Sequence, residues 1–192
     1  MNAKVEISRK AVFLDRDATL NTHPGGGWVV HPDGLELIPG IAPPLKRFAE
    51  AGYLLIVITN QRGVALGRLS LETLAEINRK LFDELEAKGV RLDGLYFCPH
   101  GDEAGCDCRK PKPGMLLKAA REFGIDLEAS WMLGDQDRDA QTAVAAGVTP
   151  LLVRSDERTS INVDGVETPI LDDLAAAARH ILGGQGSPDT AV

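Results

Sequence analysis

The sequence predicts an α/β fold, an open and doubly wound parallel sheet with helices on both faces. Short apolar runs alternate along the chain with segments in which apolar residues recur at helical spacing. The apolar runs are continuous, which is typical of strands buried on both faces. Alternation of strands and helices predicts a parallel sheet that binds its ligand at the carboxyl ends of the strands.

Five apolar runs are the expected strands. The two clearest, residues 11–14 and 53–58, lead directly into Asp15 and into Thr59-Asn60. Short apolar segments bounded by glycine or charged residues are typical of buried strands. Three weaker runs of this kind lie at 95–98, 131–133 and 150–153.

The clearest expected helix begins after Ser70 and ends at Gly89. Between them, leucine and isoleucine recur at spacings of three and four. A serine can accept a hydrogen bond from the first helical turn, and glycine is common directly after a helix. Further helices are expected at 42–51, 113–123, 139–146 and 171–182.

Length and composition bound the class of protein. With 192 residues, the chain fits one domain, expected at 1–183 without a large cap domain and followed by a disordered tail at 184–192. The net charge of -7 disfavours a nucleic-acid interface, which needs many lysines and arginines. No apolar run has the length of a signal peptide or the roughly 18 to 20 residues of a membrane span. We therefore expect a cytoplasmic monomer that binds neither nucleic acid nor membranes.

Acidic and polar side chains follow three of the expected strands. Asp15 and Asp17 follow the first, Thr59-Asn60 the second, and Asp135 the run at 131–133. Taken alone, the first pair could be an Asx-rich turn. However, the carboxyl ends of parallel strands meet at one edge of a sheet, and carboxylates with phosphate and water oxygens are the ligands that Mg²⁺ prefers. The coincidence of three strand ends predicts a magnesium and phosphate site.

The chain has three cysteines, and all of them lie close to one histidine. The four residues are Cys98, His100, Cys106 and Cys108. Three thiolates and one imidazole form a complete tetrahedral set for Zn²⁺, and a set without an open position is typical of a structural site. The alternative is a group of unrelated buried thiols beside a surface histidine. An odd number of cysteines favours the metal site over a disulfide framework.

A basic segment follows the last cysteine. Arg109 and Lys110 concentrate positive charge in an otherwise acidic chain, and Pro111 and Pro113 stiffen the segment at an expected helix start. Exposed basic residues are usually only solvated surface. Their rigid placement here predicts a role in binding phosphate, with the zinc holding the loop that ends at these two residues.

Four segments in chain order resemble the motifs of the haloacid dehalogenase (HAD) superfamily of phosphatases. They are Asp15-Arg16-Asp17, Thr59-Asn60-Gln61, Arg109-Lys110-Pro111 and Gly134-Asp135. The cysteine and histidine cluster is similar to that of the branch containing heptose bisphosphate phosphatases and histidinol-phosphate phosphatases. The resemblance implies a Mg²⁺-dependent phosphatase acting on a small phosphorylated metabolite, in first place heptose 1,7-bisphosphate, from which the 7-phosphate would be removed.

The resemblance also implies roles for the acidic residues. Asp15 would be the nucleophile that forms an aspartyl-phosphate, and Asp17 would protonate the leaving oxygen and then activate water. Mg²⁺ would be held by Asp15, by the backbone carbonyl of Asp17 and by Asp135. Covalent catalysis of this kind divides hydrolysis into two phosphoryl transfers.

Phosphate binding is likewise implied by the resemblance. Thr59, Asn60 and Lys110 would bind the transferring phosphoryl group, where fixed donors and cations stabilise the spread negative charge. The residues expected to recognise the rest of the substrate are Arg109, His23, Arg62 and Gln136.

Two departures from the family pattern leave alternatives open. Ala18 stands where the family has glycine, and a positive φ at this position would cost about 1 kcal/mol or more. Residues 62–68 differ from the heptose bisphosphate phosphatases, which have Ser-Gly and a later arginine there, so that Arg62 or Arg68 would supply the missing charge. The alternatives are histidinol phosphate or another small sugar phosphate as substrate, or an impaired homologue that only binds a phosphate ligand. A zinc-dependent nucleic-acid-binding module is disfavoured by charge and by the shortage of aromatic residues.

Overall fold

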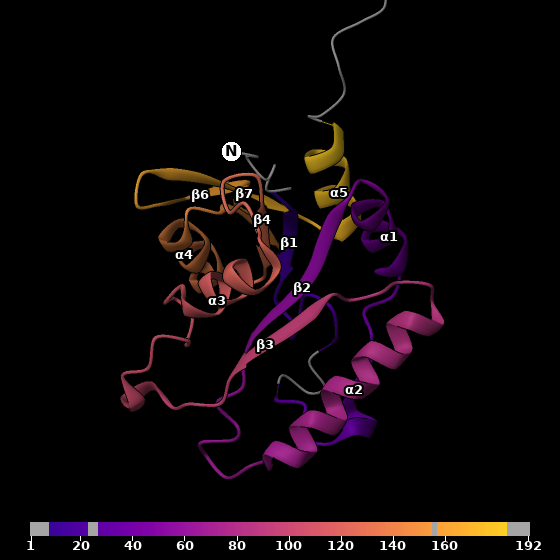
Figure 1. Ribbon diagram of the computed structural model, residues 1–192, viewed down its shortest axis with the longest axis vertical. Coiled ribbons are helices and arrows are strands. Elements are labelled where there is room, and N and C mark those ends of the chain that lie inside the picture. Colours follow the sequence, from indigo (N-terminus) through magenta and orange to yellow (C-terminus); the bar gives the residue numbers. More distant parts are fainter. Residues whose placement is uncertain (1–7, 23–26, 155–156, 184–192) are drawn as a thin grey trace, which may run out of the picture.

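The computed structural model describes residues 8–22, 27–154 and 157–183. A seven-stranded sheet with the order β3-β2-β1-β4-β5-β7-β6 forms its centre (Figure 1). Every neighbouring pair is parallel except β6 and β7, which confirms the predicted open, mostly parallel sheet. The strands are β1 (Lys10–Leu14), β2 (Tyr53–Asn60), β3 (Gly94–Cys98), β4 (Trp131–Gly134), β5 (Thr149–Val153), β6 (Ser160–Val163) and β7 (Val166–Leu171).

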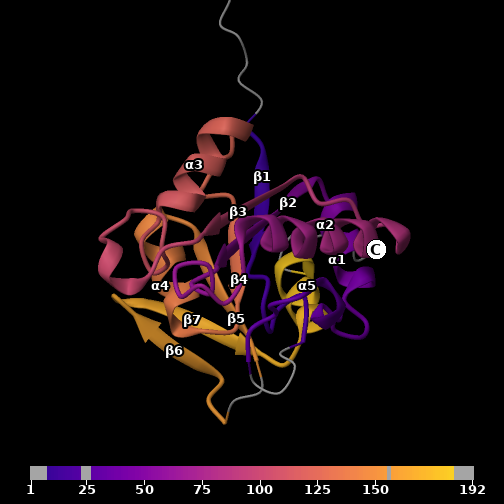
Figure 2. The same ribbon diagram turned by 90° about the horizontal axis from the view of Figure 1, so that it is seen from below.

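Helices cover both faces of the sheet (Figure 2). One face packs against α1 (Ala42–Glu50), α2 (Leu71–Ala87) and α5 (Leu174–Gly183). The other face packs against α3 (Gly114–Phe123) and α4 (Asp137–Ala146). Because successive strand residues point to opposite faces, both sets of side chains along a central strand are buried. This double burial explains the continuous apolar runs in the sequence.

The central strand β1 illustrates this division of the core. Val12 and Leu14 belong to the cluster with α1, α2 and α5, whereas Ala11 and Phe13 belong to the cluster with α3 and α4. All four side chains are fully buried. A strand anchored on both faces holds the residues at its carboxyl end in a fixed position, and Asp15 is the first of these.

The structure corrects two expectations about the end of the chain. The hairpin of β6 and β7 was not expected, because its residues are partly exposed and carry no continuous apolar run. The last helix begins at Leu174 and not at residue 171, because Leu171 ends β7 and Asp173 Oδ1 then accepts a hydrogen bond from Ala176 N at 2.6 Å. His23 and the expected tail at 184–192 lie outside the described residues.

Among the helices that the structure describes, none combines the length and the apolar character needed to cross a lipid bilayer.

The turn after β1 contains an alanine in the left-handed region. Ala18 has a φ of 62°, and its N–H donates to Asn21 O at 2.8 Å. An L-residue with a side chain is strained in this region, whereas glycine is not. The departure from the family pattern at position 18 therefore falls where glycine has a physical advantage.

We expect Ala18→Gly to increase the free energy of unfolding by up to about 1 kcal/mol, because relief of strain exceeds the entropy that glycine adds to the unfolded chain. Urea unfolding followed by circular dichroism measures this change. Ala51→Gly is the matched control, since Ala51 has an ordinary φ of -79° and should lose stability. An equal decrease in the free energy of unfolding in both variants would show that position 18 is not strained.

Candidate active site and metal centre

The carboxyl ends of β1, β2 and β4 bring predicted motif residues to one edge of the sheet. Asp15 directly follows β1, Thr59 lies near the end of β2, and Asp135 directly follows β4. Asp15 N donates to Leu133 O at 2.8 Å, and this hydrogen bond links the ends of β1 and β4. Carboxylate oxygens of Asp15, Asp135 and Asp139 lie within 4.8 Å of one another. This arrangement offers oxygen ligands to a divalent cation.

Lys110 places a buried positive charge in the same cluster. Its Nζ lies 2.7 Å from Asp15 Oδ1 and 2.7 Å from Asp139 Oδ1, and it donates to Ile58 O at 3.0 Å. Lys110 is only 3% exposed, and Asp139 is fully buried. Burial alone would lower the pKa of Lys110, but the two carboxylates outweigh it and the pKa is raised. Lys110 is therefore a permanent cation at the edge of the sheet.

Burial has the opposite consequence for Asp15. It raises the pKa of Asp15 to about 7, although Lys110 acts to lower it, while the charges of Asp139 and Asp17 raise it further. A divalent cation beside the carboxylate would favour its ionised form. Ionisation of Asp15 is thus linked to the binding of a cation.

Asp139 is a site residue to which the motif pattern assigns no role. It lies in the first turn of α4, and its Oδ2 accepts a hydrogen bond from Gln136 N at 3.0 Å. A Cβ atom on Gly134 would lie 2.3 Å from Asp139 Oδ2, so the close approach requires glycine at that position. The spacing of four residues from Asp135 is the sequence signal that could have identified Asp139, because it places both on one side of a helix start.

Asp17 is held by its own set of donors. Both carboxylate oxygens of Asp17 lie 3.0 Å from Arg16 Nη2, Asn21 Nδ2 donates at 3.1 Å and Gln61 Nε2 donates at 2.8 Å. Burial alone would raise the pKa of Asp17, but the Arg16 guanidinium and these hydrogen bonds lower it below its usual value. Arg16 and Gln61, both buried, are thus further residues that support the site.

The polar residues at the end of β2 hold the neighbouring loop. Asn60 Nδ2 donates to Lys110 O at 3.1 Å, and Asn60 Oδ1 accepts from Lys110 N at 3.0 Å. Thr59 Oγ1 accepts from Gln61 Nε2 at 2.8 Å. The side chain of Asn60 therefore positions Lys110, a contact that the motif alone does not predict.

The predicted zinc ligands come together at the end of β3 and on the loop that follows it. Cys98 Sγ lies 3.7 Å from Cys106 Sγ and 3.5 Å from His100 Nδ1, which lies 3.3 Å from Cys108 Sγ. All four ligand atoms lie within 4.8 Å of one another. Two sulfurs bound to a tetrahedral Zn²⁺ at 2.3 Å are about 3.8 Å apart, so the spacing is compatible with this ion. The donor set therefore fits a structural zinc site.

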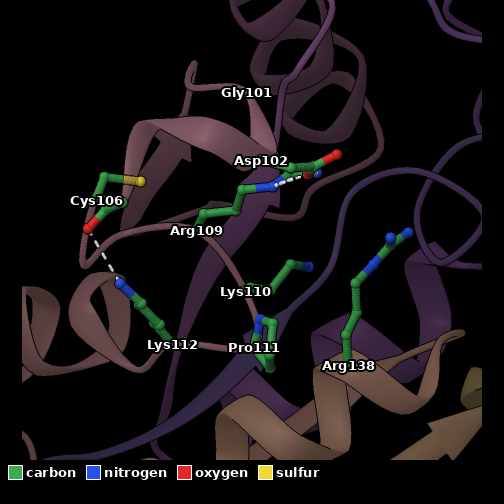
Figure 3. A pocket seen from close by; sticks show the side chains of 9 residues that line it. Gly101, Asp102, Cys106, Arg109, Lys110, Pro111, Lys112 and Arg138 are labelled. Carbon is green, nitrogen blue, oxygen red and sulfur yellow. Dashed lines mark hydrogen bonds and ion pairs between the residues drawn. The ribbon is translucent and has the colours of Figure 1, made fainter.

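A pocket of about 410 Å³ lies between the segment 101–112 and Arg138 at the start of α4 (Figure 3). Arg109, Lys110 and Arg138 line it and make it cationic. Arg138 is an exposed residue in the first turn of α4 that the motif pattern does not single out. The pocket is therefore suited to an anionic ligand.

The expected substrate-binding residues fall into different groups. Arg62 and Arg109 meet at Asp102, 2.8 Å and 2.6 Å from its carboxylate oxygens. Gln136 Nε2 instead donates to Asp135 Oδ2, and Gln136 does not belong to the residues that line the pocket. No position can be given for His23, which is outside the described ranges.

Comparisons with known proteins agree with this geometry. A family model described as HAD-hydrolase-like matches residues 107–177. The D-glycero-β-D-manno-heptose-1,7-bisphosphate 7-phosphatase of Photorhabdus laumondii is 38% identical over 181 residues, which cover 90% of this chain and 95% of the relative. The protein of the same name from Escherichia coli K12 is 38% identical over 179 residues, covering 89% of this chain and 93% of the relative.

Solved structures give the same assignment. The D,D-heptose 1,7-bisphosphate phosphatase from B. bronchiseptica, complexed with magnesium and phosphate, has a TM-score of 0.81 and 34% identity, covering 91% of this chain and 99% of that one. A putative HAD-like phosphatase from Mesorhizobium loti has a TM-score of 0.80 and 27% identity, covering 99% and 94%. The chain belongs to the HAD superfamily of phosphatases, in the family of the heptose-1,7-bisphosphate 7-phosphatases.

Proposed function

We propose that this protein is a Mg²⁺-dependent phosphatase that removes the 7-phosphate of D-glycero-D-manno-heptose 1,7-bisphosphate through an aspartyl-phosphate on Asp15. The observation that carries the proposal is the contact of Asp15 with a buried lysine, Lys110, next to the carboxylate of Asp135. The substrate is suggested by the names of relatives that are 36% to 38% identical. Asp15 and Lys110 supply a nucleophile and a fixed cation, the two groups that phosphoryl transfer on a carboxylate requires.

In the first step, an oxygen of Asp15 attacks phosphorus and the bond from phosphorus to the leaving oxygen breaks. Lys110 and the hydroxyl of Thr59 stabilise the negative charge on the phosphoryl oxygens. Asp17 gives its proton to the leaving oxygen, which departs as an alcohol. For this role Asp17 must first take up a proton, which becomes favourable when the substrate replaces a contact that lowers its pKa, such as the hydrogen bond from Gln61.

In the second step, Asp17 takes a proton from a water molecule as that water attacks phosphorus. The bond between phosphorus and Asp15 breaks, which restores the carboxylate and releases inorganic phosphate. Lys110 stays in place throughout because Asp139 and Ile58 O also hold it. The same cation therefore serves both transfers.

Magnesium fits the donors at this edge. Asp15 and Asp135 would hold it, with the backbone carbonyl of Asp17, whereas Asp139 is committed to Lys110. Bound there, Mg²⁺ would neutralise charge on the phosphoryl group and favour the ionised form of Asp15.

Zinc would be bound by Cys98, His100, Cys106 and Cys108, whose thiolates suit a reducing compartment such as the cytoplasm. Its proposed role is to hold the loop that leads to Arg109 and Lys110. We further propose that the protein acts as a monomer with a single domain at 1–183.

Phosphate release from a panel of esters tests the function. The panel contains both anomers of heptose 1,7-bisphosphate, histidinol phosphate and common sugar phosphates, with Mg²⁺. We expect heptose bisphosphate to be preferred, and Asp15→Asn to lower the rate by at least about 1,000-fold because the nucleophile is lost. Asp83→Asn, on the exposed side of α2, is the matched control. Preference for another ester would refute the substrate, and no release from any ester would favour the impaired homologue.

Asp139→Asn tests whether the ion pair with Asp139 holds Lys110 in place. We expect kcat to fall about 10- to 100-fold with little change in KM, because a displaced Lys110 no longer matches the transition state. Asp137→Asn is the control, since Asp137 lies in the same helical turn but pairs with Arg154. A variant with unchanged kcat would show that Asp15 and Ile58 O are sufficient to place Lys110.

Cys106→Ser tests the zinc centre. We expect zinc content, measured by atomic emission, to fall from about one equivalent to a small fraction, because a closed tetrahedral site loses one of its thiolates. Activity should fall with it, since the loop before Lys110 loses its anchor. His31→Ala, which removes a histidine outside the cluster, should leave the zinc content unchanged. Full zinc content in Cys106→Ser would contradict this assignment of the ligands.

A further inference from the structure

Two arginines from separate segments converge on one carboxylate beside the pocket. Asp102 Oδ1 accepts from Arg109 Nε at 2.7 Å and lies 2.6 Å from Arg109 Nη2. Asp102 Oδ2 lies 2.8 Å from Arg62 Nη1. Arg62 follows β2, whereas Arg109 follows the zinc cluster, so Asp102 is the link between these segments.

We propose that Asp102 is a positioning residue that holds Arg62 and Arg109 as one clamp for a second anionic group of the substrate. The inference rests on the proposed function and deepens it, because it concerns the phosphate that is not transferred. Asp102 itself is not expected to contact the reacting atoms.

The clamp retains both charge and hydrogen-bond donors for a ligand. Two guanidinium groups share one carboxylate, which leaves one positive charge in excess. The side chain of Arg62 is 42% exposed, so its guanidinium group is accessible to a ligand. The remaining contact of Arg109 is a long one, from Nη1 to His100 O at 3.4 Å. A phosphate group, with several acceptor oxygens, matches these donors.

The clamp lies next to the site of phosphoryl transfer. Arg109 and Lys110 are adjacent in the sequence and line the same pocket. Figure 3 shows Asp102 and Arg109 together on one side of Lys110. A ligand with one phosphate beside Asp15 and Lys110 can therefore extend its far end toward the two arginines. A monophosphate has no group to place there.

Asp102 lies on a short turn beside an expected zinc ligand. It begins the short helical turn Asp102–Ala104, two residues after the expected zinc ligand His100. Long arginine side chains lose much rotamer freedom when they are fixed, and two like charges repel each other. Without Asp102, Arg62 would be free to separate from Arg109, and this freedom would be lost on binding. The negative charge of Asp102 also repels an incoming anion, but both carboxylate oxygens are already paired with guanidinium nitrogens. When Asp102 is replaced, we therefore expect that poorer positioning of the two arginines weakens substrate binding more than the weaker repulsion strengthens it.

Steady-state kinetics with matched substrates test the inference. Wild type, Asp102→Asn and Asp102→Ala are compared on heptose 1,7-bisphosphate, fructose 1,6-bisphosphate, their monophosphates and p-nitrophenyl phosphate. For the bisphosphate that wild type prefers, we expect KM to rise about tenfold with kcat within twofold. For the monophosphates and p-nitrophenyl phosphate, both parameters should stay unchanged. Glu103→Gln, an exposed carboxylate in the same turn, is the control and should match wild type.

A double variant identifies the path of the effect. Arg62→Gln should raise KM for the bisphosphate in the same way, and its combination with Asp102→Asn should add little, since both remove the same clamp. Zinc content should remain that of wild type in each variant. Additive effects of the two substitutions would overturn the inference.

The outcomes separate the inference from the proposed function. An unchanged or lower KM in the Asp102 variants, or equal losses on bisphosphates and monophosphates, would overturn the role of Asp102 and leave the proposed function intact. Wild type that hydrolyses p-nitrophenyl phosphate but prefers no bisphosphate over its monophosphate would refute both the proposed substrate and the clamp. Wild type that hydrolyses none of the esters would refute the proposed function as a whole.

Discussion

The buried ammonium group of Lys110 and its two carboxylate partners, Asp15 and Asp139, set the conditions that the rest of the site must meet. A buried charge without a partner is very unfavourable, and removal of one partner from a buried pair typically costs about 3 to 5 kcal/mol. The partners come from different elements, since Asp15 follows β1 and Asp139 belongs to α4. The charge is balanced only when the strands and helix have assembled. Folding and formation of the site are thus the same event at this edge of the sheet.

Other features of the site keep Lys110 in this position. Asn60 holds its backbone by two hydrogen bonds, which link β2 to a loop without regular structure of its own. Gly134 permits Asp139 to approach β4, because any side chain there would collide with its carboxylate. In the proposed zinc site, Cys106 and Cys108 would fix the segment that leads to Lys110. The position of one side chain is therefore determined from three directions, which accounts for the low exposure of Lys110.

The sequence predicted those parts of the molecule in which a single physical pattern dominates. The strands around β1 are buried on both faces, so their apolar runs are continuous and easily recognised. The hairpin of β6 and β7 lies at the exposed edge, where partial burial leaves no such pattern. Within the site, the ends of parallel strands bring Asp15 and Asp135 together, and Thr59 lies on the neighbouring strand at the same edge of the sheet. The pairing of Asp102 with two arginines was not predictable, because it depends on the path of a loop that has no periodicity.

The short turn Asp102–Ala104 lies in a loop outside the sheet, between His100 and Cys106, two of the residues proposed to bind zinc. A metal centre tolerates changes in the length of the segment between its ligands as long as the ligands themselves return to the same place. Residues in such a segment can be inserted, lost or exchanged without disturbing the buried charges at the strand ends. In the proposed mechanism, the loop with Asp102 affects the choice of substrate, whereas Asp15 and Lys110 at the strand ends perform the hydrolysis. The loop tolerates mutation and the strand ends do not, so the choice of substrate can diverge between related proteins while the hydrolytic chemistry is preserved.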